Sequence, residues 1–229
     1  AFAYLQDVLE SESDDNRAKK KMREICEALA VESDSLAKKD KFEQAGALCQ
    51  KASKGFKSIG DLNRADEMEQ QQFNFLDLKQ AQVLAAEEHY SQPGGAIGLY
   101  NRVLERSPQN EYAHEGLKPI ALDIEKYGIQ HEGEKKFDEA KERFSVANSV
   151  WKKLVSLRPS DVGYDEGQKR TQDAVERCDA ALSNQQASEN TSDRVSSQSE
   201  SILMTSPSHQ PEASHTTVDS IQTISELHP

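Results

Sequence analysis

The sequence predicts an all-α protein made of stacked antiparallel helical hairpins. Apolar residues recur three or four positions apart over long stretches, which is the spacing of one face of a helix. The seven prolines are nearly absent from the middle of these stretches, and alternating runs of β-branched residues are missing. Hydrophobic residues make up 35% of the chain and charged residues 30%. This polar balance suits thin helical repeats, because they expose more surface per residue than a compact domain does.

The clearest hairpin spans residues 124–147. Apolar or small residues recur at helical spacing on both sides of a short polar break at Gly133. Two amphipathic helices joined by so short a turn must fold back on each other. The small residues Gly128 and Ala140 stand where the two backbones would cross, with aromatic residues such as Phe144 around them. We therefore expect Ala140 to be buried at a close crossing, with Gly128 opposite.

This large–small–large pattern resembles that of a tetratricopeptide repeat. A second resemblance covers Ala81 to Pro108, and it is carried by Tyr90, Ala96, Tyr100 and the closing proline. The second helices of the hairpins begin near Lys41, Gly94 and Phe137, intervals longer than the roughly 34 residues of the family. We therefore describe the chain as tetratricopeptide-like. The resemblance implies an α-solenoid in which the first helices of the hairpins line a groove that binds a peptide or a partner helix.

Three segments follow one another along the chain. Residues 1–15 hold a short helix and an acidic linker, residues 16–185 form the helical repeat domain, and residues 186–229 form a tail. Helices of the repeat domain are expected over residues 16–36, 40–56, 62–90, 93–107, 110–131, 137–157 and 161–182. A break near residues 70–72 is the alternative to one long helix over 62–90, because apolar residues thin out there. The last helix has no partner, which is typical of the capping helix at the open end of a repeat stack.

Particular residues predict where several helices begin or bend. Asp40 and Glu43 form a capping box, in which two side chains bind free backbone amides. Pro93 stands where a helix readily starts, since its missing N–H would have had no partner. Pro119 should kink its helix or split off the first turn. Three further caps are predicted at Asp61, Asn110 and Asp161.

The tail, residues 186–229, is dominated by Ser, Thr, Gln and Glu and has no aromatic residue. A segment of this composition buries too little apolar area to offset its ordering entropy, so we expect it to be disordered.

Charge and cysteine usage bound the partners and the compartment. The formal net charge of −12 argues against non-specific binding to nucleic acid or to an anionic membrane, since both need positive patches. The basic run at Lys19–Lys21 is interpreted as a solvated helix face, because acidic residues lie beside it. Cys26, Cys49 and Cys178 are far apart and odd in number, which favours buried thiols in a reducing compartment over disulfides or a zinc site.

No run approaches the roughly 18 apolar residues that a membrane span needs, so we expect no direct membrane insertion. Because the cysteines indicate a reducing compartment, a cytoplasmic protein is predicted. The chain opens with Ala1 instead of Met, which also fits a processed form or a piece of a longer protein. An extracytoplasmic or membrane-tethered location, through an upstream signal or anchor, is the alternative.

Nothing in the sequence has the pattern of a catalytic site. His89, His114 and His131 lie on different expected helices and lack the spacing of metal ligands. The glycines of residues 94–98 precede a helix, as in a phosphate loop, but the Gly-Lys-Ser/Thr ending and a preceding strand are missing. We therefore expect no enzyme, no cofactor and no metal.

The predicted function is that of a non-catalytic protein–protein interaction scaffold. The partner-binding residues expected on the inner face of the third hairpin are Leu122, Glu125, Ile129 and Glu132. This mixed apolar and acidic lining suits a protein or peptide partner that is amphipathic and partly basic. The alternative is a structural or regulatory segment of a larger enzyme or of a membrane-anchored receptor. Neither the identity of the partner nor the oligomeric state follows from the sequence.

Overall fold

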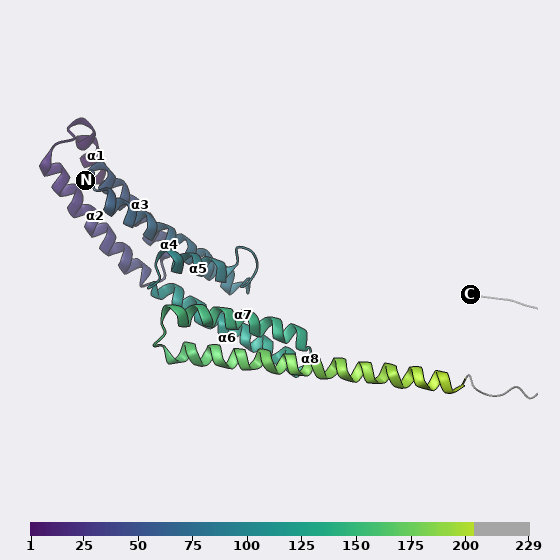
Figure 1. The fold of residues 1–229 in the computed structure, drawn as a ribbon. Helices are drawn as coiled ribbons and strands as arrows, with labels where there is room; N and C mark the ends of the chain where they lie inside the picture. The colour runs from purple at the N-terminus through teal and green to yellow at the C-terminus, as the bar shows by residue number, and fades with distance from the viewer. Residues whose placement is uncertain (204–229) are drawn as a thin grey trace, which may run out of the picture. The chain divides into compact units, whose positions relative to one another are not determined.

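The computed structural model describes the backbone of residues 1–203 and the side chains of residues 1–188. All regular structure in this part of the chain is helical, and no strand occurs in it, which confirms the all-α prediction. The helices are α1 (Phe2–Ser11), α2 (Asn16–Ala37), α3 (Phe42–Ser58), α4 (Leu62–Ala86), α5 (Ala96–Arg106), α6 (Glu111–Gly133), α7 (Phe137–Leu157) and α8 (Val162–Leu203) (Figure 1). The chain divides into two compact units, residues 1–183 and residues 184–229, and the packing described next lies within the first.

Consecutive helices of the first unit fold back on one another as hairpins. α2 packs against α3, α4 against α5, and α6 against α7 (Figure 1). Short turns join the first and third pairs, and a longer loop over residues 87–95 joins α4 to α5. The helices α3 and α4, and α5 and α6, are also in contact, so the hairpins stack in chain order. A single cluster of buried apolar residues runs from Leu9 in α1 to Tyr164 in α8.

Side chains cap three helices at the positions that the sequence predicts. Asp61 accepts a hydrogen bond from the amide of Arg64 at the start of α4, at 3.4 Å. Asn110 accepts one from the amide of Ala113 in α6, at 3.1 Å. Asp161 accepts one from the amide of Gly163 in α8, at 3.0 Å. Each cap satisfies a backbone donor that the first turn of a helix leaves free.

The capping box predicted at Asp40 and Glu43 is wrong. α3 begins at Phe42, and its N-terminal neighbour Lys41 makes no side-chain cap. Asp40 has a φ of 55°, in the left-handed region, and the amide of Lys41 bonds to the carbonyl of Leu36 at 3.0 Å. This bond is the closing bond of a left-handed turn at the end of α2. Because Asp40 ends one helix in this way, it does not start the next.

The connection between α4 and α5 also differs from the prediction. α4 is continuous through residues 70–72, so the alternative break does not occur, and it ends at Ala86. α5 starts at Ala96, after Pro93, which therefore lies outside the helix. The amides of Ala96 and Ile97 bond to carbonyls in the preceding turn, at 2.9 and 3.1 Å, and this turn fixes where α5 begins. α6 continues through Pro119 without a break, so the first turn is not split off.

The crossing of α6 and α7 is as close as the small residues predict. A Cβ atom on Gly128 would meet Cε1 of Phe144 at 2.8 Å, so only glycine allows this approach. Ala140 is fully buried in a cluster with Phe144 and with Ala174 and Cys178 of α8. α8 thus packs on the same hairpin.

α8 extends to Leu203, beyond the end predicted near residue 182. The disorder predicted for the tail concerns residues 186–229, of which residues 204–229 lie outside the described part of the chain.

Candidate functional site

α6 has α4, the first helix of the preceding hairpin, on one flank and the final helix α8 on the other. On the α8 flank, Glu125 accepts two hydrogen bonds from Arg170, at 2.9 and 3.1 Å. Two helical turns further along α6, Glu132 accepts two hydrogen bonds from Arg177, both at 3.1 Å. Both members of each pair advance by seven residues, which shows that α6 and α8 run parallel here. The chain itself supplies the cationic partners of these two glutamates.

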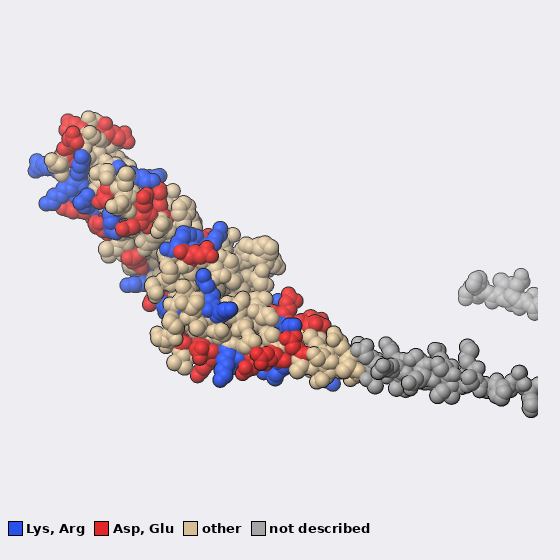
Figure 2. Space-filling view, in the orientation of Figure 1, with Lys and Arg blue, Asp and Glu red and all other residues tan. Residues whose placement is uncertain are grey.

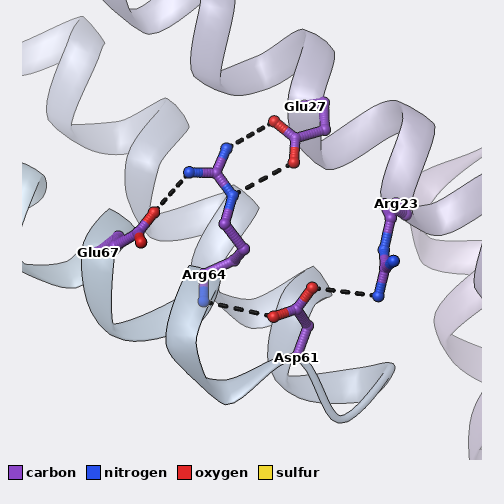
Figure 3. A network of polar contacts seen from close by, with 5 residues as sticks. All are labelled: Arg23, Glu27, Asp61, Arg64 and Glu67. Carbon is purple, nitrogen blue, oxygen red and sulfur yellow. Dashed lines mark hydrogen bonds and ion pairs between the residues drawn. The ribbon is translucent and has the colours of Figure 1, made fainter.

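The same arrangement joins α2 and α4 (Figure 3). Arg64 of α4 donates to both carboxylate oxygens of Glu27 in α2, at 3.2 and 2.6 Å. Seven residues later on each helix, Gln71 donates to Asp34 at 2.7 Å. Arg23 also pairs with Asp61 at 3.1 Å across the same two helices (Figure 3). Acidic side chains of α2 therefore bind donors of α4, and acidic side chains of α6 bind donors of α8.

The four predicted partner-binding residues do not share one open face. Glu125 is only 8% exposed and Glu132 is half-buried, because both lie under arginines of α8. Leu122 and Ile129 are 45% and 57% exposed, on the outward side of α6. The sequence placed all four in a groove because helical spacing defines a face but does not say which helix covers it.

On its other flank, α6 and α4 border a series of hollows of about 170, 330 and 210 Å³. The first two hollows share Gln82, Tyr100 and Gly116, and the last two share Tyr90. We call this series the α4–α6 groove. Its α6 wall consists of Tyr112, Glu115, Gly116, Pro119, Ile120, Asp123, Ile124, Tyr127 and His131, and the opposite wall of Asp40, Phe42, Leu78, Gln82, Ala85, Glu88 and Tyr90. Tyr100 of α5 and Arg143 of α7 complete the lining.

Four tyrosines line the α4–α6 groove, and two of them bind its carboxylates. Tyr90 donates from its hydroxyl to Asp123 at 2.7 Å, and Tyr127 donates to Glu88 at 2.8 Å. These bonds connect α6 with the segment that follows α4. The hydroxyls fix the two carboxylates in place, one on each wall.

The pKa values of these tyrosines reflect burial and the negative surroundings. Burial, with Asp40 nearby, raises the pKa of Tyr100 to about 12. Burial and the bond to Asp123 raise the pKa of Tyr90. The bond to Glu88 is the main cause of the raised pKa of Tyr127. Each phenol therefore stays protonated, and available as a hydrogen-bond donor, at neutral pH.

The groove is acidic. Its carboxylates are Asp40, Glu88, Glu115 and Asp123. Within the described part of the chain, no lysine, arginine or histidine nitrogen lies within 4.0 Å of any of them. Arg143 borders only the last hollow, together with His131. The negative charge on this flank thus lacks the arginines that cover the α8 flank.

Other surfaces of the described residues are weaker candidates for a binding site. On the face drawn in Figure 2, basic side chains gather over the beginning of α2, where Lys19 and Lys21 pair with Asp14 and Glu24 at 3.5 and 2.8 Å. A hollow of about 690 Å³ lies at the turn between α7 and α8, and six of the eight residues bordering it are residues 158–163, the turn and the first two residues of α8. No three His, Cys, Asp or Glu side chains of the described residues are placed to hold a metal ion.

Sequence reasoning missed the α4–α6 groove, although part of its signal was there. Tyr112, Gly116, Asp123 and Tyr127 recur at helical spacing on α6, beside the stripe that was chosen. In the sequence, Tyr90 and Tyr100 match positions of a tetratricopeptide-like repeat, which does not indicate that they line a groove. A stripe of tyrosines and carboxylates that avoids lysine and arginine was the feature to look for.

Comparison of the chain with protein families, with curated proteins and with solved structures finds no match. Among the described residues, no helix combines the length and the apolar character needed to cross a bilayer.

Proposed function

We propose that this protein is a non-catalytic protein–protein interaction scaffold whose α4–α6 groove binds a lysine- or arginine-bearing segment of a partner. The observation that carries the proposal is the row of carboxylates along the groove, with no cationic side chain of the described chain bound to them. A guest that brings its own cations gains charge-assisted hydrogen bonds there. Complementary charge also speeds association and selects among partners.

The tyrosines favour the same guest. Their ring faces attract cations, and a contact of this kind contributes about 0.5–2 kcal/mol, depending on how far it is desolvated. Because Tyr90 and Tyr127 already hold Asp123 and Glu88, little conformational freedom is lost when a guest binds. Ala85 and Ile120 add apolar surface to the groove, so an amphipathic, partly basic segment suits it best.

The chain provides an internal model of such binding. Arg170 and Arg177, seven residues apart on α8, bind two glutamates on the opposite flank of α6. A partner segment with cationic side chains at a similar spacing would do the same in the α4–α6 groove. We further propose that the hairpins are tetratricopeptide-like, with the first helices forming the binding side.

We also propose a cytoplasmic location. Cys26, Cys49 and Cys178 are unpaired and buried, which accords with a reducing compartment.

The test is the affinity of the full-length protein for a fluorescein-labelled amphipathic peptide rich in lysine and leucine. A triple variant, Glu88→Gln, Glu115→Gln and Asp123→Asn, removes three groove charges while keeping side-chain shape. We expect it to weaken binding about tenfold or more, since charge partners of this kind are worth a few kcal/mol together.

The matched control removes three exposed carboxylates of α7, by Asp138→Asn, Glu139→Gln and Glu142→Gln. It changes the net charge equally but leaves the groove intact, so we expect less than about a twofold effect. Equal weakening by the two triple variants would show that only net charge matters and would overturn the proposal. No measurable binding by the unmodified protein would overturn it as well.

A further inference from the structure

The outward face of α6 carries a row of side chains that the groove does not use. Lys118, Leu122, Lys126 and Ile129 are all exposed, and they recur four, four and three residues apart. Residues at this spacing lie along one stripe of a helix. Leu122 and Ile129 are separated by seven residues, which is about 10 Å of helix rise. The stripe thus presents two apolar side chains in line, with a lysine between them and another before them.

The location of exposed apolar side chains in the described residues is not random. Nine large ones are exposed, and eight of them lie on α2, α4, α6 or α8. None lies on α3, α5 or α7, whose side chains are all described. Apolar surface is therefore concentrated on the first helices of the hairpins and on α8. An exposed apolar patch bordered by charge is typical of a protein interaction site.

The charges on this stripe select its partner. Lys118 and Lys126 make no hydrogen bond or ion pair with any described residue. Glu125 and Glu132, which border the stripe towards α8, are bound to arginines of α8. Glu115 and Asp123, three residues before Lys118 and Lys126, line the α4–α6 groove on the other side and pair with neither lysine. The stripe is therefore apolar and basic, whereas the neighbouring groove is acidic.

We propose that the outward face of α6 docks a helix of a partner protein that presents two apolar side chains seven residues apart, flanked by carboxylates. The apolar pair of the guest packs on Leu122 and Ile129, and its carboxylates pair with Lys118 and Lys126. Helices that pack side by side meet through such repeating positions. This surface and its ligand differ from the α4–α6 groove and its cationic guest, so either proposal stands if the other fails.

The probe is a synthetic helical peptide with leucines at positions i and i+7 and glutamates on both sides of them. Two companions have the same length: one has the leucines moved to different faces, and the other has lysines in place of the glutamates. Binding to the full-length protein is measured by fluorescence anisotropy. We expect the first peptide to bind about tenfold tighter than either companion, as specific contacts of a few residues dominate such interfaces. Equal binding of all three peptides would overturn the proposal.

Variants of the protein locate the contact. The double variant Leu122→Ser and Ile129→Ser should weaken the acidic peptide about tenfold. The double variant Lys118→Glu and Lys126→Glu should weaken the acidic peptide and strengthen the lysine peptide, because the preferred charge is reversed.

Controls of the same chemistry are Val31→Ser on α2 and Lys54→Glu on α3, both at exposed positions. They should leave binding unchanged, and a circular dichroism melt of every variant shows that it is folded. Weakening by the controls as large as that by the α6 variants would contradict the proposal. So would a dimer in sedimentation experiments that Leu122→Ser dissociates, because the face would then be covered by a second copy of the chain.

Discussion

The two flanks of α6 present acidic side chains in two different states. Towards α8, Glu125 and Glu132 are bound by Arg170 and Arg177, and the ring of His114 stacks on Tyr164. Towards α4, the carboxylates lie among tyrosines along open hollows, and no arginine of the described chain forms an ion pair with them. A carboxylate on a helix is therefore structural or available depending on a residue some 45 positions away in the sequence. A carboxylate of α6 is available to a partner where the neighbouring helix has no arginine that pairs with it.

The α2–α4 contact shows that the closed state is the common one in this fold. There too, an arginine of the later helix, Arg64, binds a glutamate of the earlier one, Glu27 (Figure 3). The α4–α6 contact is the exception, because the donor to the carboxylate of Glu88 is Tyr127 and not an arginine. This exception is what makes the groove a candidate site.

Substitutions that test packing density should give the largest difference in stability between the two flanks. Ala140 is fully buried against α8, so Ala140→Leu overpacks the core and should lower the free energy of unfolding by about 1–3 kcal/mol. Ala85 borders the open groove, and Ala85→Leu should change stability by less than about 0.5 kcal/mol. Urea unfolding measures both. An unchanged midpoint for Ala140→Leu would contradict the close packing of α6, α7 and α8 around Ala140.

Removing one arginine should have the next largest effect, because it leaves an acid without its partner. Arg170→Met leaves Glu125, which is 8% exposed, unpaired, and should cost about 1–3 kcal/mol of stability. Arg177→Met should cost less than about 1 kcal/mol, since Arg177 and Glu132 are more exposed. Adding Glu125→Gln to Arg170→Met should restore part of the loss. Equal costs for the two arginines would show that burial does not set their contribution.

Acid should weaken the closed flank through His114. This histidine is fully buried beside Tyr164 of α8, and its Nε2 bonds to the carbonyl of Pro108 at 3.0 Å. Burial lowers its pKa in the folded state, so below about pH 6.5 the unfolded chain binds the proton more readily. The stability contributed by neutral His114 is therefore present above its unfolded pKa and is lost as pH falls. The slope is at most about 1.4 kcal/mol per pH unit.

The measurement compares wild type with His114→Gln in urea unfolding between pH 5 and 8, chosen to bracket the ordinary pKa of about 6.5. Only the wild-type protein should show the contribution of His114 to the slope of the free energy of unfolding against pH. Parallel pH profiles for the two proteins would show that other groups cause the dependence.

The smallest effect concerns a single phenol in the groove. The bond to Glu88 is the main cause of the raised pKa of Tyr127, so Glu88→Gln should lower that pKa towards the ordinary value of about 10. A titration followed by ¹³C NMR of the tyrosine ring carbon that bears the hydroxyl measures it. Tyr164, on the α8 flank, serves as the control and should titrate as before. An unchanged Tyr127 would show that Glu88 does not accept its hydrogen bond in solution.

Much of the fold follows from local sequence, and the site does not. Helical periodicity and caps such as Asn110 predict the hairpins, and Gly128 predicts the close contact with Phe144. Asp40 was misread because it ends α2 in a left-handed turn, a role that depends on how the chain reverses. The fate of Glu125 depends on Arg170, and helical spacing alone does not reveal this contact between distant segments.

The most direct test uses the six tyrosines of the chain, four of which line the α4–α6 groove. The full-length protein, labelled with ¹³C in its tyrosine rings, is titrated with the lysine–leucine peptide and followed by NMR. Tyr90, Tyr100, Tyr112 and Tyr127 should shift together with one affinity. Tyr4 in α1 and Tyr164 in α8 should stay in place. Shifts of Tyr4 or Tyr164 as large as those of the groove tyrosines, or no shift at all under conditions of binding, would contradict an open groove on this flank of α6.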